Sequence, residues 1–149
     1  MRFWLVPLIL FSPLIGCNAG SQPTQIQLPV PPRLRLQLYS LASQPSSTTS
    51  TLAVGSLPVN VVVQTPPVIT DLDIDHFVVT FRDDGYVEVK AAIIASGISK
   101  LQALGNPNGA WLARVLNGSS SDALWYDAPR LGVIRIGLFE PKAYERCFR

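Results

Sequence analysis

Two strand-forming runs joined by a short turn constrain the fold of this chain more than any other stretch. Residues 76–81 (HFVVTF) and 86–94 (YVEVKAAII) are rich in β-branched and aromatic residues, which favour pleated, half-buried backbone. Asp84-Gly85 between them is typical of a tight primed turn, because that turn needs positive φ, which Asp84 tolerates and Gly85 adopts without strain. The pattern predicts a β-hairpin at the centre of the domain, with the turn at these two residues.

Further short strands are predicted on both sides of this hairpin. Residues 33–38 (RLRLQL) alternate apolar and polar side chains, as a strand does when one face packs on a core. Prolines and Gly-Asn-Ser clusters separate the other apolar runs, which predicts about eight short strands between residues 25 and 139. Ile98, Leu101 and Leu104 are spaced by three before Gly105, which predicts one short helix. The expected fold is therefore mainly β, an antiparallel β-sandwich or small partly open barrel with one short helix.

Composition excludes several classes of function. The chain has 149 residues and a net charge of only +2, so it lacks the basic patch that nucleic-acid binding requires. Two cysteines and one histidine cannot complete a zinc shell. The sequence also lacks a Gly-x-Ser-x-Gly elbow and a glycine-rich phosphate loop. We therefore expect no catalytic residues, no metal and no cofactor, and we predict that the protein is not an enzyme.

One acidic run comes closest to a site. Asp71, Asp73 and Asp75 at spacing two would share one face of a strand and could gather calcium, but His76 stands where the EF-hand loop requires glycine. A solvated strand edge is the simpler interpretation. Because strand neighbours alternate faces, Asp75 is expected to point away from His76, which excludes a Ser-His-Asp arrangement.

The first residues of the chain have the character of a targeting segment. The apolar run over residues 3–14 is shorter than the ~20 residues of a membrane-spanning helix, and Pro7 and Pro13 interrupt it. It ends in Leu14-Ile15-Gly16-Cys17. This leader resembles the signal peptide of bacterial lipoproteins, whose lipobox has Leu at minus three, a small or aliphatic residue next, Gly or Ala at minus one, and then an obligatory Cys.

The lipoprotein resemblance implies a processed and anchored chain. It implies cleavage before Cys17, a diacylglyceryl thioether on that cysteine and an acylated new N-terminus, so that two or three acyl chains such as palmitate give stable attachment. Asn18 points to the outer membrane of a Gram-negative cell. The expected organisation is a signal peptide over 1–16, a lipidated N-terminus with a proline-rich spacer over 17–32, and a β domain over 33–149.

Other origins of the leader stay open at the sequence level. Cys17-Asn18-Ala19 could serve as a small-x-small cleavage site, which would release a soluble domain beginning at Gly20. That product would be a secreted β-sandwich binding module, for example for carbohydrate, or a viral structural protein. An uncleaved anchor is the third interpretation.

The preferred hypothesis is a non-enzymatic envelope lipoprotein whose β domain binds a partner protein or supports assembly of an envelope complex, by analogy of size and location with pilotins and secretion-system lipoproteins. Trp111, Trp125 and Tyr126 are the candidate partner-binding residues, although core packing is the simpler use of aromatics in a small β domain. Cys147 is a candidate for an intermolecular disulfide, with an inert thiol as the alternative.

Overall fold

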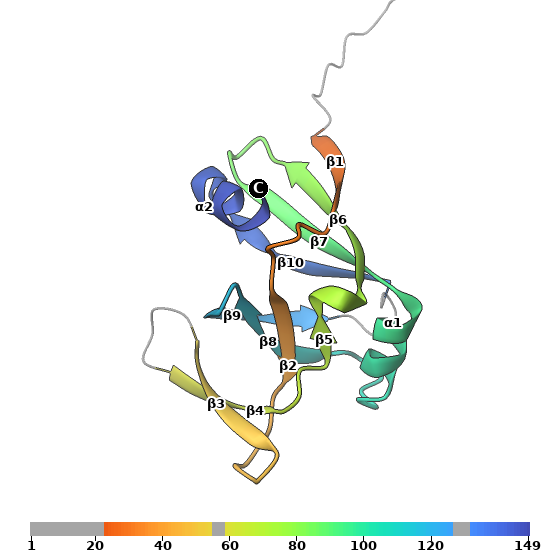
Figure 1. Ribbon diagram of the computed structural model, residues 1–149, viewed down its shortest axis with the longest axis vertical. Coiled ribbons are helices and arrows are strands. Elements are labelled where there is room, and N and C mark those ends of the chain that lie inside the picture. The colour runs from red at the N-terminus through yellow and green to blue at the C-terminus, as the bar shows by residue number, and fades with distance from the viewer. Residues whose placement is uncertain (1–22, 55–58, 127–131) are drawn as a thin grey trace, which may run out of the picture.

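The computed structural model describes residues 23–54, 59–126 and 132–149. This part of the chain is mainly β, with its strands in antiparallel sheets that form an open sandwich (Figure 1). No closed barrel occurs among the described residues. The fold class predicted from the sequence is confirmed.

The first sheet contains the predicted central hairpin. Its strand order is β1-β6-β7-β10, with bounds of Thr24–Pro29, Ile74–Phe81, Val87–Ile93 and Val133–Phe139. Side chains of β7 alternate between fully buried and half-exposed positions, because one face packs on the core and the other faces solvent. Strand β1 pairs with β6, so the sheet begins inside the segment predicted as a spacer.

The second sheet packs against the first and supplies the other half of the core. Its strand order is β5-β2-β8-β9, with bounds of Ile69–Thr70, Leu36–Ser40, Ala110–Leu116 and Ser119–Tyr126. The alternation predicted from residue 33 onward is seen in Leu34, Leu36 and Leu38, which are all completely buried. In Figure 1 this sheet lies below the first one.

A separate two-stranded ribbon extends from the second sheet. It consists of β3 (Thr49–Val54) and β4 (Val59–Gln64), and neither has another strand partner within the part of the chain that the structure describes. An isolated bridge between Leu41 and Val63 joins its base to the chain that follows β2. In Figure 1 the ribbon projects away from the sandwich as an arm.

Helix α1 (Ala95–Gln102) covers one end of the core, as the spacing of Ile98, Leu101 and Leu104 predicted. Leu101 is buried, and Gly97 packs so closely that an added Cβ would lie 2.6 Å from a methyl carbon of Ile93. The helix ends before Gly105, which has a φ of 71°. Glycine takes this left-handed conformation without strain, so it ends the turn.

A second helix was not expected from the sequence. The charged tail forms α2 (Pro141–Phe148), with proline at its first turn, where the missing N–H has no intrahelical partner to lose. Tyr144 and Phe148 are buried, and Phe148 makes edge-to-face contacts with Phe77 and Phe139 at centroid distances of 5.3 Å. Among the described residues, no helix is long and apolar enough to cross a membrane.

The turn between β6 and β7 and the turn between β8 and β9 differ in length and backbone conformation. The β6–β7 hairpin is confirmed, but its turn is longer than predicted, since Arg82 N–H donates to Tyr86 O and Gly85 N–H donates to Arg82 O. Gly85 has positive φ, whereas Asp84 does not and instead accepts the Tyr86 N–H. The tight primed geometry occurs at Asn117-Gly118, between β8 and β9, where both residues have positive φ.

Candidate functional site

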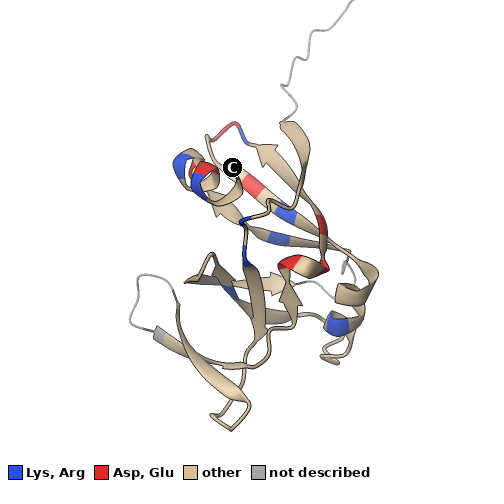
Figure 2. Ribbon diagram, viewed as in Figure 1, with Lys and Arg blue, Asp and Glu red and all other residues tan. Residues whose placement is uncertain are grey.

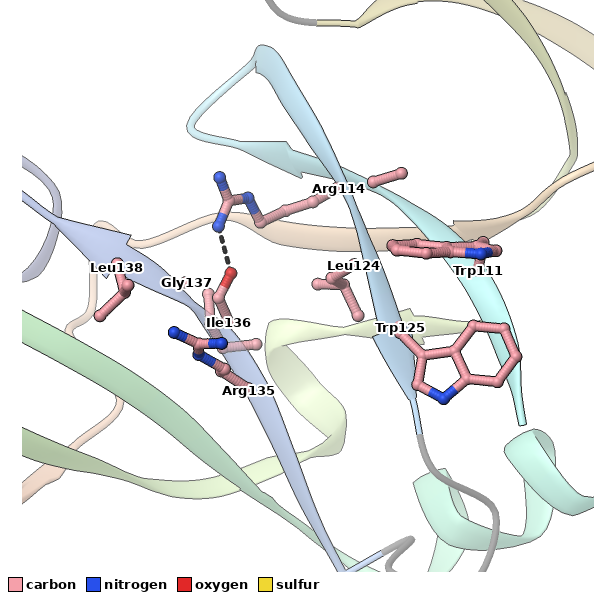
Figure 3. Close-up of a pocket in the computed structure, with 9 residues that line it drawn as sticks. Trp111, Arg114, Leu124, Trp125, Arg135, Ile136, Gly137 and Leu138 are labelled. Carbon is pink, nitrogen blue, oxygen red and sulfur yellow. Dashed lines mark hydrogen bonds between the residues drawn. The ribbon is translucent and has the colours of Figure 1, made fainter. Parts of the chain in front are cut away.

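A groove lies where the outer strands of the two sheets approach each other. Strand β9 is the edge of the second sheet and β10 is the edge of the first. Residues of β8, β9 and β10 enclose an open hollow of about 550 Å³ (Figure 3). It is within the size range of small-ligand and peptide-anchor pockets. Its lining consists of Trp111, Arg114, Ala123, Leu124, Trp125, Arg135, Ile136, Gly137 and Leu138.

An exposed tryptophan pair forms one wall of this groove. Trp111 and Trp125 lie directly opposite each other in the β8–β9 ladder, and 52% and 45% of their surfaces are exposed. Their rings meet edge to face, with centroids 5.5 Å apart and planes at 72°. Large aromatics exposed side by side are unusual on a monomeric surface and typical of binding surfaces.

The third predicted aromatic does not join the pair. Tyr126 follows Trp125 in β9 and therefore points to the opposite face of the sheet, where it is 2% exposed within the core. Core packing thus accounts for Tyr126 but not for the two tryptophans.

A buried arginine of β8 reaches across to β10. Arg114 is 7% exposed in β8, and its guanidinium donates a hydrogen bond to the carbonyl of Ile136 in β10 and lies 5.4 Å from the centre of the Phe139 ring. The β7–β10 register shifts between Arg135 and Gly137, which leaves Ile136 as the extra residue of a β-bulge. Arg114 therefore supplies a donor to a carbonyl at a point where the ladder is interrupted.

Glycine at position 137 makes room for this contact. A Cβ there would collide with a terminal nitrogen of Arg114. Sequence reasoning did not single out Arg114 as a site residue, although a lone charged residue within the apolar strand 110–116 was a visible signal that it has buried partners.

A second arginine stands at the mouth of the groove. Arg135 is half exposed, and its Nε lies 3.0 Å from Oε1 of Glu88. The other carboxylate oxygen of Glu88, Oε2, lies 3.2 Å from Lys90 Nζ. Figure 2 shows this short charge ladder across β7 and β10 on the first sheet. The lining residues that the structure describes include both arginines, and Arg114 lies opposite Asp122 in the β8–β9 ladder.

The acidic run after β5 does not form the solvated edge that the sequence predicted. Asp71 and Asp73 belong to a short 3₁₀ turn, η1 (Asp71–Asp73), rather than to a strand. Asp73 is buried and accepts hydrogen bonds from Lys100 Nζ at 2.7 and 2.9 Å. Burial works against ionisation of Asp73, but the Lys100 and Thr70 hydrogen bonds prevail, and its pKa is lowered below 3.8.

The expectation that Asp75 points away from His76 is also wrong. Asp75 Oδ2 lies 2.8 Å from His76 Nδ1. The β6–β7 register shifts between Ile74 and His76, so Asp75 is the extra residue of a bulge and the alternation of faces is interrupted there. No group of three potential ligands for a metal ion occurs among the described residues.

Of the two cysteines, Cys147 lies within the residues that the structure describes and Cys17 does not. Cys147 lies half-buried in α2 as a free thiol, packed against the core. Cys17, the predicted lipidation site, and the whole predicted signal peptide lie outside the described residues.

Comparison with known proteins gives little further information. No family model and no curated protein matches the chain. Among solved structures, the chain is similar to part of SecDF in its Super-membrane-facing form, with a TM-score of 0.49 and 18% identity. The similarity covers 78% of this chain and 18% of that chain. At this level it carries no information about activity or partners.

Proposed function

We propose that this protein is a non-catalytic envelope lipoprotein, anchored through Cys17, whose β domain binds a partner protein in the groove between β9 and β10. The observation that carries the binding part of the proposal is the exposed Trp111–Trp125 pair beside an open hollow of about 550 Å³. Tryptophan is enriched at the centres of protein–protein interfaces, where it contributes a large share of the binding energy.

The anchoring part rests on the sequence. Leu14-Ile15-Gly16-Cys17 matches the lipobox position by position. The first strand begins at Thr24, so at most about 25 Å of extended chain would separate the lipidated cysteine from the sheet. A domain held on so short a tether works close to the bilayer, and its partner would be an envelope protein.

The rival interpretation, a secreted carbohydrate-binding module, finds less support in the groove. Sugar rings stack on an open aromatic face. In the tryptophan pair the ring planes stand at 72° and the edge of one ring meets the face of the other, so the pair does not offer a continuous flat platform.

A pull-down from the membrane fraction tests the proposed function. The full chain carries a C-terminal tag, and proteins recovered with the wild type are compared by quantitative mass spectrometry with those recovered by Trp111→Ala/Trp125→Ala. We expect at least a tenfold loss of one or a few specific envelope proteins, because removal of paired aromatic anchors typically costs ~2 kcal/mol or more.

Lys142→Ala provides the matched control, since Lys142 is exposed on α2, outside the groove lining. It should recover the same proteins as the wild type. Equal recovery by the tryptophan variant and the wild type would contradict the proposal.

A further inference from the structure

We propose that Asn108 is a site of spontaneous deamidation in the folded protein, whereas the fold protects Asn117 from the same reaction. Both asparagines are exposed, and each is followed by glycine. Three features carry the proposal: the chemistry of an Asn-Gly pair, the hydrogen bonds that hold each pair, and the backbone conformation of each asparagine. The proposal goes beyond the proposed function and does not depend on it.

The reaction needs only the chain and water. The backbone nitrogen of the glycine loses its proton to solvent and attacks the side-chain carbon Cγ of the asparagine. An N–Cγ bond forms, the Cγ–Nδ2 bond breaks, and ammonia leaves. Water then opens the resulting succinimide ring at either carbonyl, which gives aspartate or isoaspartate. Attack within one dipeptide is favoured by proximity, and glycine, which has no Cβ, permits the backbone rotation that ring closure requires.

The loop between α1 and β8 contains a second asparagine that cannot react in this way. Asn106 precedes Pro107, whose backbone nitrogen carries no proton to lose. Asn108 precedes Gly109 and is exposed. Figure 1 shows this loop at the edge of the molecule, beside α1. Within the loop, the reaction is therefore expected at Asn108 and not at Asn106.

Few contacts hold the Asn108-Gly109 pair in place. Gly109 N–H donates to Asn106 O at 3.2 Å, which is at the long end of the normal range for a hydrogen bond. Among the described residues, the Asn108 side chain has no hydrogen-bond partner. Ring closure at Asn108 therefore requires the loss of one weak hydrogen bond, in a loop that belongs to neither sheet.

Asn117 is held more firmly. Its backbone N–H donates to Arg35 O at 2.8 Å, and its side-chain Oδ1 accepts the Arg35 N–H at 2.9 Å. It lies in the turn between β8 and β9 with a φ of 50°. In this left-handed conformation the nitrogen of the next residue points away from Cβ. Ring closure there needs a rotation that disrupts the turn and releases the side chain from Arg35, so the fold opposes the reaction.

Peptide mapping of the full chain can test this comparison. Trypsin cleaves after Lys100, Arg114 and Arg130, so the two Asn-Gly pairs fall in separate peptides, residues 101–114 and 115–130. The protein is incubated at pH 8 in buffer and, in parallel, in guanidinium chloride at a concentration that unfolds it. Conversion is followed as the mass increase when an amide becomes a carboxylic acid, and isoaspartate is identified by enzymatic methylation with an isoaspartate-specific methyltransferase.

The comparison of folded and unfolded protein isolates the effect of the fold. In guanidinium chloride both pairs should react at rates set by local sequence alone. In buffer, the ratio of the Asn108 rate to the Asn117 rate should be higher by about fivefold or more, because one additional hydrogen bond must break at Asn117. Both aspartate and isoaspartate should appear at Asn108, since both arise from the succinimide.

Asn108→Gln is the matched variant. It keeps an amide in the loop, but attack by the next nitrogen would have to close a larger ring, which is slower. The peptide 101–114 of this variant should keep its mass during the incubation, while conversion at Asn117 should proceed as in the wild type.

Several outcomes would overturn the proposal. The same ratio of rates in buffer and in guanidinium chloride, or faster conversion of Asn117 in buffer, would show that the fold does not protect Asn117. Absence of conversion at Asn108 in buffer would show that the loop is protected as well. Conversion without isoaspartate would exclude the succinimide, and a mass increase in peptide 101–114 of Asn108→Gln would place the reaction at another amide.

Discussion

Asp73 is the clearest case of a residue whose role depends on contacts far away in the chain. Its carboxylate is buried beneath α1, where Lys100 and the Thr70 backbone N–H donate to it. The sequence placed it in a solvated acidic run because its partner Lys100 lies 27 residues later. A short-range pattern cannot reveal a contact of that kind.

We predict that Asp73→Asn lowers the free energy of unfolding by about 2 kcal/mol at pH 7, the usual worth of buried hydrogen bonds to a charged group. The pKa of Asp73 is lowered in the folded state. The contribution of the Asp73 carboxylate to the free energy of unfolding is therefore complete above the unfolded-state pKa of about 3.9. It is lost as the pH falls through the folded-state pKa.

Urea unfolding of the wild type and the variant between pH 3 and pH 7 measures this difference. The difference between the two curves should be full above about pH 4 and should shrink as the pH falls below that value towards the lowered folded-state pKa of Asp73. Asp83→Asn, on the exposed hairpin turn, is the control and should change stability by less than about 0.5 kcal/mol at pH 7. A constant difference across the pH range would contradict the assignment.

At the scale of elements, the sequence predicted the strands better than the end of the chain. The alternation in residues 33–38 and the β-rich runs of the central hairpin were sufficient to predict strands, because the local pattern of apolar residues agrees with their burial there. Helix α2 was missed since its composition is charged, yet Tyr144 and Phe148 are spaced by four, as on one helix face. The short length of the tail concealed that pattern.

Two predictions about local geometry were also wrong, the tight turn at Asp84-Gly85 and the direction of the Asp75 side chain. Asp84-Gly85 has the residues of a tight primed turn, but the hairpin has a longer loop in which Asp84 accepts hydrogen bonds from Arg82 and Tyr86. Bulges at Asp75 and Ile136 interrupt the alternation of faces. Gly137 beside Ile136 was a signal for the second bulge, because glycine inside a strand often marks one, whereas no such residue marks the bulge at Asp75.

We expect Phe148→Ala to destabilise the protein by about 3 kcal/mol, the lower end of the range for a buried phenylalanine. The ring contacts Phe77 and Phe139 edge to face and stacks on Tyr144, so its loss would detach α2 from the first sheet. Urea unfolding monitored by circular dichroism gives the value. Arg149→Ala, on the exposed last residue, should have almost no effect, and equal effects of the two substitutions would exclude a structural role for α2.

At the scale of the whole molecule, the sequence predicted an antiparallel β-sandwich or small partly open barrel, but not the groove. The groove exists because the edge strand of one sheet lies beside the edge strand of the other, while Arg114 of β8 donates to the Ile136 carbonyl of β10. Which strands become edges follows from the strand order, and local patterns contain no information about it. Trp111 and Trp125 were singled out from the sequence, while Tyr126 belongs to the core.

The tether gives the whole molecule a direction relative to the bilayer in our account. Thr24 pairs with Phe81, beside the β6–β7 turn, so a chain leading from Cys17 would hold this end of the first sheet close to the lipid. The function of the groove then depends on the anchor, because both domain and partner would be confined to the same surface.

Mass spectrometry of the mature N-terminus, on protein purified from both the membrane and the soluble fraction, tests the proposed anchor most directly. Our account predicts that the first residue is Cys17 carrying a diacylglyceryl thioether and an acylated amino group, and that Cys17→Ser leaves the full-length precursor without lipid. An unmodified N-terminus at Gly20, on protein found in the soluble fraction, would contradict the account.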